Sequence, residues 1–149
     1  MRIVIQRVTR ASVSIEGRVE SAIEKGMMVL LGVGYADTDD DIDWLVKKTI
    51  NLRIFDDSEG VMNLSVKDVE GSILVVSQFT LMASCKKGNR PSYIHAASPD
   101  VSVPLYERFC QRLSEELGKP VSTGVFGADM QVELVNDGPV TIVIDSKDK

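Results

Sequence analysis

Strand-type spacing of apolar side chains dominates this sequence and restricts the folds open to it. Alternation of apolar with polar residues is typical of strands that bury one face. It occurs over residues 3–8, 12–15, 130–135 and 140–144. Met27–Leu31 is instead a continuous apolar run between two glycines, which predicts a strand buried on both faces. A further apolar strand is predicted over Ser72–Phe79.

Only two segments show helical spacing. The first follows the acidic cluster Asp37–Asp43, which suits a helix N-terminus, and its apolar residues are Ile42, Leu45, Val46 and Ile50. The second has a leucine or phenylalanine every four residues from Leu105 to Leu117 and begins at either Pro99 or Pro104. We therefore predict a single domain over residues 1–149 of the α+β class. It would be a curved, mainly antiparallel sheet or barrel with two main helices packed against it.

Two short polar segments are predicted to reverse the chain. Glu16-Gly17 favours a hairpin after the first strand. Asn136-Asp137-Gly138-Pro139 is typical of a turn between the last two strands. A Gly-Pro bond can be cis at low cost, and a cis bond would aim the carbonyls of Gly138 and Pro139 in nearly the same direction. Such a pair of acceptors could recognise a ligand as well as form a turn.

Composition narrows the class of partner. The net charge is -5, with 17 basic and 22 acidic side chains, so nothing attracts nucleic acid in general and DNA is not expected as a partner. The apolar runs are too short to cross a membrane, and the N-terminus does not resemble a signal peptide. Cys85 and Cys110 are expected to be free thiols, which predicts a cytoplasmic protein.

Few residues offer obvious chemistry. His95 is the single histidine and no Gly-x-Ser-x-Gly motif accompanies it, while no zinc-type spacing exists, so no metal is expected. The cluster Lys86, Lys87 and Arg90 could contact phosphates or form a solvated loop. Ser77-Gln78-Phe79-Thr80 ends an apolar strand with three hydrogen-bonding side chains, which either cap neighbours or form a site.

Two of these segments carry a family resemblance. Ser77-Gln78-Phe79-Thr80-Leu81 and Asn136–Thr141 resemble the two signature motifs of D-aminoacyl-tRNA deacylases, and flanking segments match in the expected order. The resemblance implies a homodimeric cytoplasmic enzyme that hydrolyses the ester between a D-amino acid, or mischarged glycine, and the 3′-terminal adenosine of tRNA. It implies no cofactor. Met82 departs from the family pattern, in which an aromatic residue usually follows the first motif.

The resemblance also implies roles for individual residues. It places the catalytic pocket at Ser77, Gln78, Phe79 and Thr80, with the amides of Phe79 and Thr80 holding the oxyanion. The attack would be assisted by the 2′-hydroxyl of the terminal adenosine, or alternatively made by the Thr80 hydroxyl. A non-enzymatic module that binds RNA ends is the other alternative.

The second motif would supply selectivity. Gly138 and Pro139 would enter the partner's pocket and exclude L-amino acids, with Arg7 holding their carbonyls unless it forms only a surface salt bridge. Phe126 and Met130 would line the adenosine pocket, or could equally belong to the core. Lys86, Lys87 and Arg90 would contact the RNA backbone.

Overall fold

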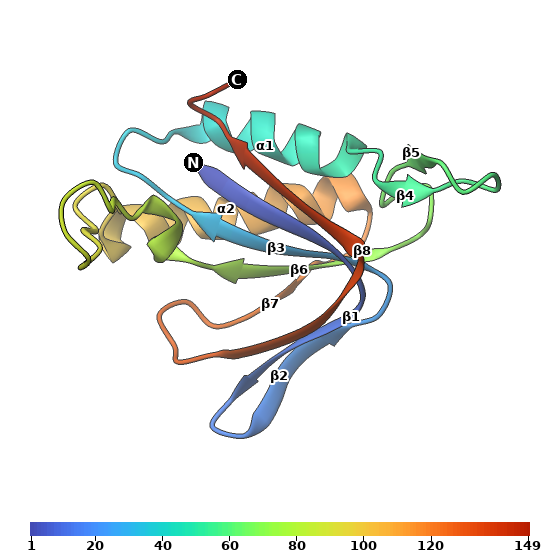
Figure 1. Cartoon of the computed structure of the whole chain (residues 1–149), viewed down its shortest axis with the longest axis horizontal. Coiled ribbons are helices and arrows are strands. Elements are labelled where there is room, and N and C mark those ends of the chain that lie inside the picture. The colour runs from blue at the N-terminus through green and yellow to red at the C-terminus, as the bar shows by residue number, and fades with distance from the viewer.

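The computed structural model describes residues 1–149, and Figure 1 shows two helices on one face of a strongly curved sheet. Both chain termini lie at the same end of the molecule (Figure 1). The elements in chain order are β1 (Arg2–Ile15), β2 (Arg18–Ile23), β3 (Gly26–Gly32), α1 (Asp39–Asn51), β4 (Phe55–Asp56), β5 (Met62–Leu64), β6 (Ser72–Ser77), the 3-10 helix η1 (Phe79–Met82), α2 (Pro99–Leu117), β7 (Ser122–Thr123) and β8 (Gln131–Asp145).

The sheet is mixed, which corrects the prediction of a mainly antiparallel one. Its strand order is β2-β1-β3-β6-β7, and β8 also pairs with β1. β1 is antiparallel to β2, β3 and β8, but β6 is parallel to both β3 and β7. The parallel pairs arise because α1 and α2 lie in the crossover connections before and after β6. The Ser21 hydroxyl donates to the carbonyl of Thr123 at 2.7 Å, so β2 approaches β7 and the barrel is nearly closed.

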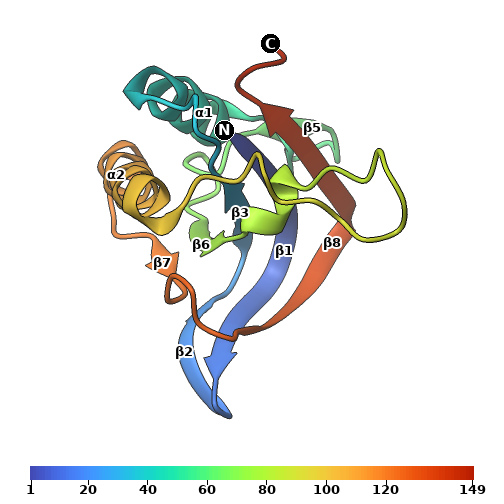
Figure 2. The same cartoon turned by 90° about the vertical axis from the view of Figure 1, so that its left-hand side faces the viewer.

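The hydrophobic core lies on both faces of β3, as its continuous apolar run predicts. Met27, Val29 and Leu31 pack in the larger core cluster, toward α1 and α2. Met28 faces the other way, into a smaller cluster inside the curve of the sheet. Figure 2 shows the two helices side by side on one side of the strands. Neither helix offers an apolar stretch long enough for a bilayer crossing.

The helix ends follow the sequence signals. Before α1, the Thr38 amide donates to the Asp41 carboxylate at 2.8 Å, which completes a capping box in the acidic first turn. α2 begins at Pro99, so Pro104 lies inside the helix. It ends at Gly118, whose φ of 86° is left-handed and suits glycine.

Two strand boundaries differ from those predicted. β6 ends at Ser77, and Phe79 begins η1 instead of continuing the strand. The segment Asn136–Pro139 is not a hairpin turn, because β8 continues through it and both halves of β8 run antiparallel to β1. Gln6 pairs with Thr141 and Val8 with Asn136, so residues 137–140 bulge from the strand opposite a single residue of β1. The predicted hairpin at Glu16-Gly17 is confirmed, with positive φ at both residues.

Candidate active site

The first polar motif lies where β6 leaves the sheet. Ser77 is the last residue of β6, and the Gln78 amide donates to the Leu31 carbonyl of neighbouring β3 at 2.8 Å. The chain then turns into η1, where the Gln78 side-chain amide donates to the Thr80 hydroxyl. The amides of Phe79 and Thr80 open this short helix and so have no acceptor within it. Two oriented donors are therefore available beside a polar strand end.

A cavity of about 250 Å³ opens beside this motif. One wall is residues 76–79, and the other is the loop before β8. Five of the predicted site residues line it: Ser77, Gln78, Phe79, Phe126 and Met130. The structure therefore brings the first motif and the predicted adenosine-pocket residues together, although they lie some fifty positions apart in the sequence.

Packing fixes the loop that forms the second wall. The Phe126 ring meets Tyr106 of α2 edge-on, with ring centroids 5.6 Å apart. Met130 folds across Gly124, where its sulfur lies 2.5 Å from the place that a Cβ would occupy. A side chain at position 124 would therefore displace Met130 from the cavity. Phe126 and Met130 are each partly buried against a core cluster and also line the cavity, and their contact with an adenosine stays a prediction.

The second motif is the bulge of β8. The Gly138-Pro139 bond is cis, as predicted, and Asp137, Gly138 and Pro139 are exposed. Arg7 lies beneath the bulge, where its Nε donates to the Asp137 carbonyl at 2.9 Å and its Nη1 to the Ile54 carbonyl at 2.7 Å. Arg7 is buried, and it also forms ion pairs with the half-exposed carboxylates of Asp56 at 3.4 Å and Asp137 at 3.6 Å, so it both holds the segment and takes part in salt bridges. It holds the segment through Asp137, one residue before the carbonyls that we expected it to contact.

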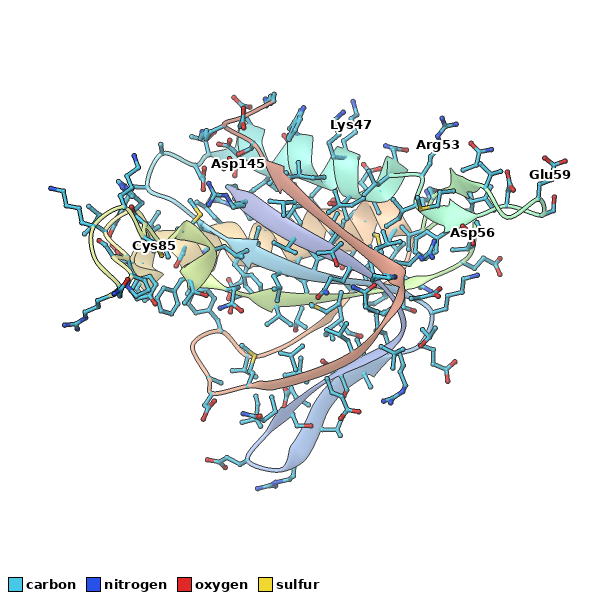
Figure 3. The ribbon with its side chains drawn as sticks, viewed as in Figure 1. Lys47, Arg53, Asp56, Glu59, Cys85 and Asp145 are labelled. Carbon is cyan, nitrogen blue, oxygen red and sulfur yellow. The ribbon has the colours of Figure 1, made fainter.

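The two motifs of one chain lie at opposite ends of the sheet. The bulge lies opposite Arg7, which pairs with Met27, which in turn pairs with Ile73 near the start of β6. The first motif begins at the other end of β6, four residues farther on at Ser77, which is roughly 13 Å along the strand at about 3.3 Å per residue. Figure 3 shows the same separation, since Cys85 after η1 and Asp56 beside Arg7 mark opposite ends of the molecule. The two motifs of one chain are therefore separated by most of the length of β6.

The basic loop follows η1, and none of its residues lines the 250 Å³ cavity. Lys86, Lys87 and Arg90 are exposed, and a bridge between Ser84 and Ser92 closes the loop that carries them. Lys86 lines a second and larger cavity together with His95. Cys85 is an exposed free thiol on the same wall, while Cys110 is a free thiol within α2. No group of histidine, cysteine and carboxylate side chains is arranged to hold a metal ion.

Burial changes the acid–base properties of α2. Burial raises the pKa of the Cys110 thiol to about 12, against the opposing effect of its hydrogen bond with Tyr106. Burial likewise raises the pKa of the Tyr106 hydroxyl above its usual range. Raised pKa values make both groups poor bases and nucleophiles near neutral pH, and α2 supports the cavity wall through the contact of Tyr106 with Phe126.

Sequence reasoning missed the larger cavity and the partners of Arg7. The cavity combines the N-terminus, the loop after β3, the loop after η1 and the C-terminal segment, and no local spacing connects them. Arg2 links this region to η1, because its Nη1 donates to the Leu81 carbonyl at 2.7 Å. Ile54 provides one of the carbonyls that Arg7 contacts, and in the sequence it belongs only to a short apolar segment after α1.

Comparison with known proteins assigns the chain to a family. Residues 4–145 match the profile described as D-Tyr-tRNA(Tyr) deacylase. The chain belongs to this family. Deacylation of an aminoacyl-tRNA is the hydrolysis of an ester, so the D-Tyr-tRNA(Tyr) deacylase family is one of ester hydrolases.

Individual relatives of this deacylase family cover the whole chain. A D-aminoacyl-tRNA deacylase of Bacteroides fragilis strain YCH46 is 66% identical over 149 residues, which is 100% of this chain and 99% of the relative. One from Porphyromonas gingivalis strain W83 is 64% identical with the same coverage.

Two solved structures are similar in fold. The structure of a c-Myc DNA Unwinding Element Binding Protein has a TM-score of 0.91 and 43% identity, and covers 97% of this chain and 98% of its own. A probable eukaryotic D-amino acid tRNA deacylase has a TM-score of 0.82 at 20% identity, with coverage of 96% and 97%. The second likeness shows a shared fold.

Proposed function

We propose that this protein hydrolyses the ester that joins a D-amino acid, or mischarged glycine, to the terminal adenosine of tRNA. The products would be the free amino acid and tRNA with its 3′-hydroxyl restored. The observation that carries the proposal is the cavity of about 250 Å³ between the Ser77–Phe79 strand end and the Phe126–Met130 loop, in a chain of the deacylase family. The tRNA substrate places the protein in the cytoplasm, and the reaction needs no cofactor.

The terminal adenosine would occupy this cavity. Phe126 and Met130 offer it an aromatic face and a polarisable thioether, both of which suit a flat base. Ser77 and Gln78 offer polar groups at the opposite wall. In this arrangement the ester lies beside the start of η1, where the free amides of Phe79 and Thr80 would hold the oxyanion that forms during hydrolysis.

The surroundings of Thr80 favour assistance by the RNA over attack by the protein. The Thr80 hydroxyl accepts a hydrogen bond from the Gln78 side-chain amide, and an amide N–H donor cannot take a proton from it. The adenosine 2′-hydroxyl adjoins the esterified 3′-oxygen and can orient a water molecule. Water then adds to the carbonyl carbon, the bond to the 3′-oxygen breaks, and a proton passes to that oxygen.

Selectivity for D-amino acids would come from a second copy of the chain. The bulge at Gly138-Pro139 is exposed and lies at the far end of the sheet from its own Ser77–Thr80 motif. We therefore propose a homodimer in which Gly138 and Pro139 of the partner subunit enter each pocket. Their carbonyls would accept hydrogen bonds from the α-ammonium and would exclude an L side chain, while glycine has only hydrogen there.

One assay tests the activity. D-aminoacyl-tRNA, L-aminoacyl-tRNA and glycyl-tRNA are each incubated with the protein, and the first and third are expected to lose their amino acid. A tRNA ending in 2′-deoxyadenosine should be nearly inert, whereas Thr80→Ala should retain substantial activity. If Thr80→Ala is inactive and the deoxy substrate is cleaved normally, Thr80 is the nucleophile. Sedimentation of an active monomer would contradict the composite site.

The alternatives give different results in the same assay. A module that only binds RNA ends would release no amino acid from any substrate. A general esterase would cleave activated small esters with little dependence on tRNA. We propose no DNA partner for this chain, because its net charge of -5 disfavours generic contacts with duplex phosphates.

A further inference from the structure

A second cavity adjoins the proposed adenosine site and has no role in the proposed reaction. It measures about 660 Å³ and is lined by Arg2, Tyr35, Met82, Lys86, Ile94 and Lys147, among others. The four-residue helix η1 separates the two cavities, because Phe79 lines the smaller one and Met82 the larger. In Figure 2, η1 and the long loop after it face the viewer, in front of the strands.

Exposed apolar side chains extend from one cavity toward the other. Phe79 and Tyr93 form an edge-on aromatic pair with centroids 5.1 Å apart, and they are 55% and 42% exposed. Tyr35 and Ile94, on the rim of the larger cavity, are 59% and 74% exposed. Exposed aromatic platforms of this kind stack the bases of single-stranded nucleic acid.

The charge of the larger cavity favours a phosphate. Its lining has four cationic groups, which are Arg2, Lys86, Lys147 and the α-ammonium of Met1, against the carboxylates of Asp37 and Asp145. Arg2 pairs with Asp145 at 2.8 Å, Lys147 pairs with Asp41 at 3.0 Å, and the Met1 ammonium pairs with Asp37. Lys86 makes no ion pair and is exposed, so its ammonium is free to meet an anion.

We propose that this cavity and the Phe79–Tyr93 pair form a binding site for the nucleotide that precedes the terminal adenosine of tRNA. Its base stacks on the exposed aromatic and apolar rim, and its phosphate faces Lys86. The proposal rests on the proposed function for the placement of the adenosine. Continuity across η1 selects the occupant, since only this short helix lies between the cavity proposed for the last base and the larger cavity.

The test compares substrates that differ by one nucleotide. The parent protein is assayed on D-aminoacyl-adenosine, on the same ester of cytidylyl-adenosine, and on D-aminoacyl-tRNA. The added nucleotide should raise kcat/KM roughly tenfold, as expected for one stacked base. Ile94→Asp and Lys86→Glu should each reduce, by about the same factor, the ratio of kcat/KM for the dinucleotide ester to that for the adenosine ester.

Matched substitutions elsewhere on the surface serve as controls. Val61→Asp changes a residue that is 54% exposed on the β4–β5 hairpin, and Lys67→Glu reverses an exposed charge. Neither should alter the ratio. A second readout does not depend on the reaction. In a titration, cytidylyl-adenosine without an amino acid should bind more tightly than adenosine, and Ile94→Asp should abolish this difference in affinity.

Each outcome decides the proposal. If both variants leave the ratio of kcat/KM unchanged, for example because kcat/KM falls equally on the mononucleotide and dinucleotide esters, the proposal is overturned. A shift of Ile94→Asp to a monomer in sedimentation would show that a second copy of the chain covers this face, and would also overturn it. If the parent cleaves no ester, the proposed function fails, and the titration alone then decides whether the second nucleotide binds.

Discussion

Arg7→Lys is the substitution that most directly tests how the Gly138-Pro139 bulge is held. The Arg7 side chain is 9% exposed and its guanidinium donates to carbonyls of two different segments, Asp137 at 2.9 Å and Ile54 at 2.7 Å. It also lies 3.4 Å from the Asp56 carboxylate. Lysine keeps the charge, but all its N–H groups leave one nitrogen, so it cannot reproduce the spacing of Nε and Nη1 that reaches the two carbonyls.

The expected loss of stability follows from these contacts. A hydrogen bond from a charged donor contributes about 1.5–3 kcal/mol, and a buried acceptor left without a donor adds to the cost. We therefore expect Arg7→Lys to lower the free energy of unfolding by about 2–4 kcal/mol. Arg10→Lys is the matched control on the same strand, because Arg10 is 60% exposed and pairs only with exposed Glu133. That surface pair should contribute about 0–1 kcal/mol.

Urea denaturation at one fixed protein concentration measures both variants, since the stability of a dimer depends on concentration. Deacylation of D- and L-aminoacyl-tRNA is measured in parallel under native conditions. Arg7→Lys should reduce kcat/KM for the D substrate more than Arg10→Lys does, because the bulge loses its anchor. If the two variants unfold at the same urea concentration with the same slope, Arg7 does not anchor the bulge and the reasoning fails.

Three further predictions concern stability and reactivity. Asp37→Asn should lower the unfolding free energy by about 3–5 kcal/mol in urea titration, because the buried α-ammonium of Met1 loses its buried carboxylate partner. Burial alone would raise the pKa of Asp41, but hydrogen bonds from Ser146, the Thr38 amide and Lys147 lower it below its ordinary value of 3.8. The stability that ionised Asp41 contributes is therefore present above about pH 4 and is lost as the pH falls further, which thermal melts of the parent and Asp41→Asn should show as a smaller acid loss in the variant. Iodoacetamide at pH 8 should modify exposed Cys85 within minutes and leave Cys110, whose pKa burial raises to about 12, unmodified by mass spectrometry until the protein unfolds.

Local spacing was enough to predict most elements and the faces that they bury. The recurrence of an apolar residue every four positions from Leu105 to Leu117 predicted α2. The continuous apolar segment Met27–Leu31 predicted a strand buried on both faces, and the structure places it between two core clusters. These predictions succeed because helix and strand periods are properties of neighbouring residues. The short strands β4 and β7 have two residues each, too few to show a period.

Strand pairing could not be predicted in the same way. Asn136–Pro139 has the composition of a hairpin turn, yet both halves of β8 pair with β1, and the four residues 137–140 bulge opposite Arg7. Nothing in the sequence of either strand indicates that β6 pairs with β3 in parallel. Pairing is decided by which edges the packed helices leave available, and that depends on the whole chain.

For the candidate site, too, some features could be predicted from the sequence and others depended on the tertiary structure. By itself, the sequence was enough to propose which residues carry the chemistry, because the two motifs could be recognised from residue types at fixed spacing and the resemblance predicted roles for Phe126 and Met130. Only the tertiary structure decided where the motifs lie. It placed Ser77–Phe79 beside the Phe126–Met130 loop and put the Gly138-Pro139 bulge at the far end of the sheet. Cavities and the partners of buried charges such as Arg7 arise from contacts between distant segments, and no local pattern encodes such contacts.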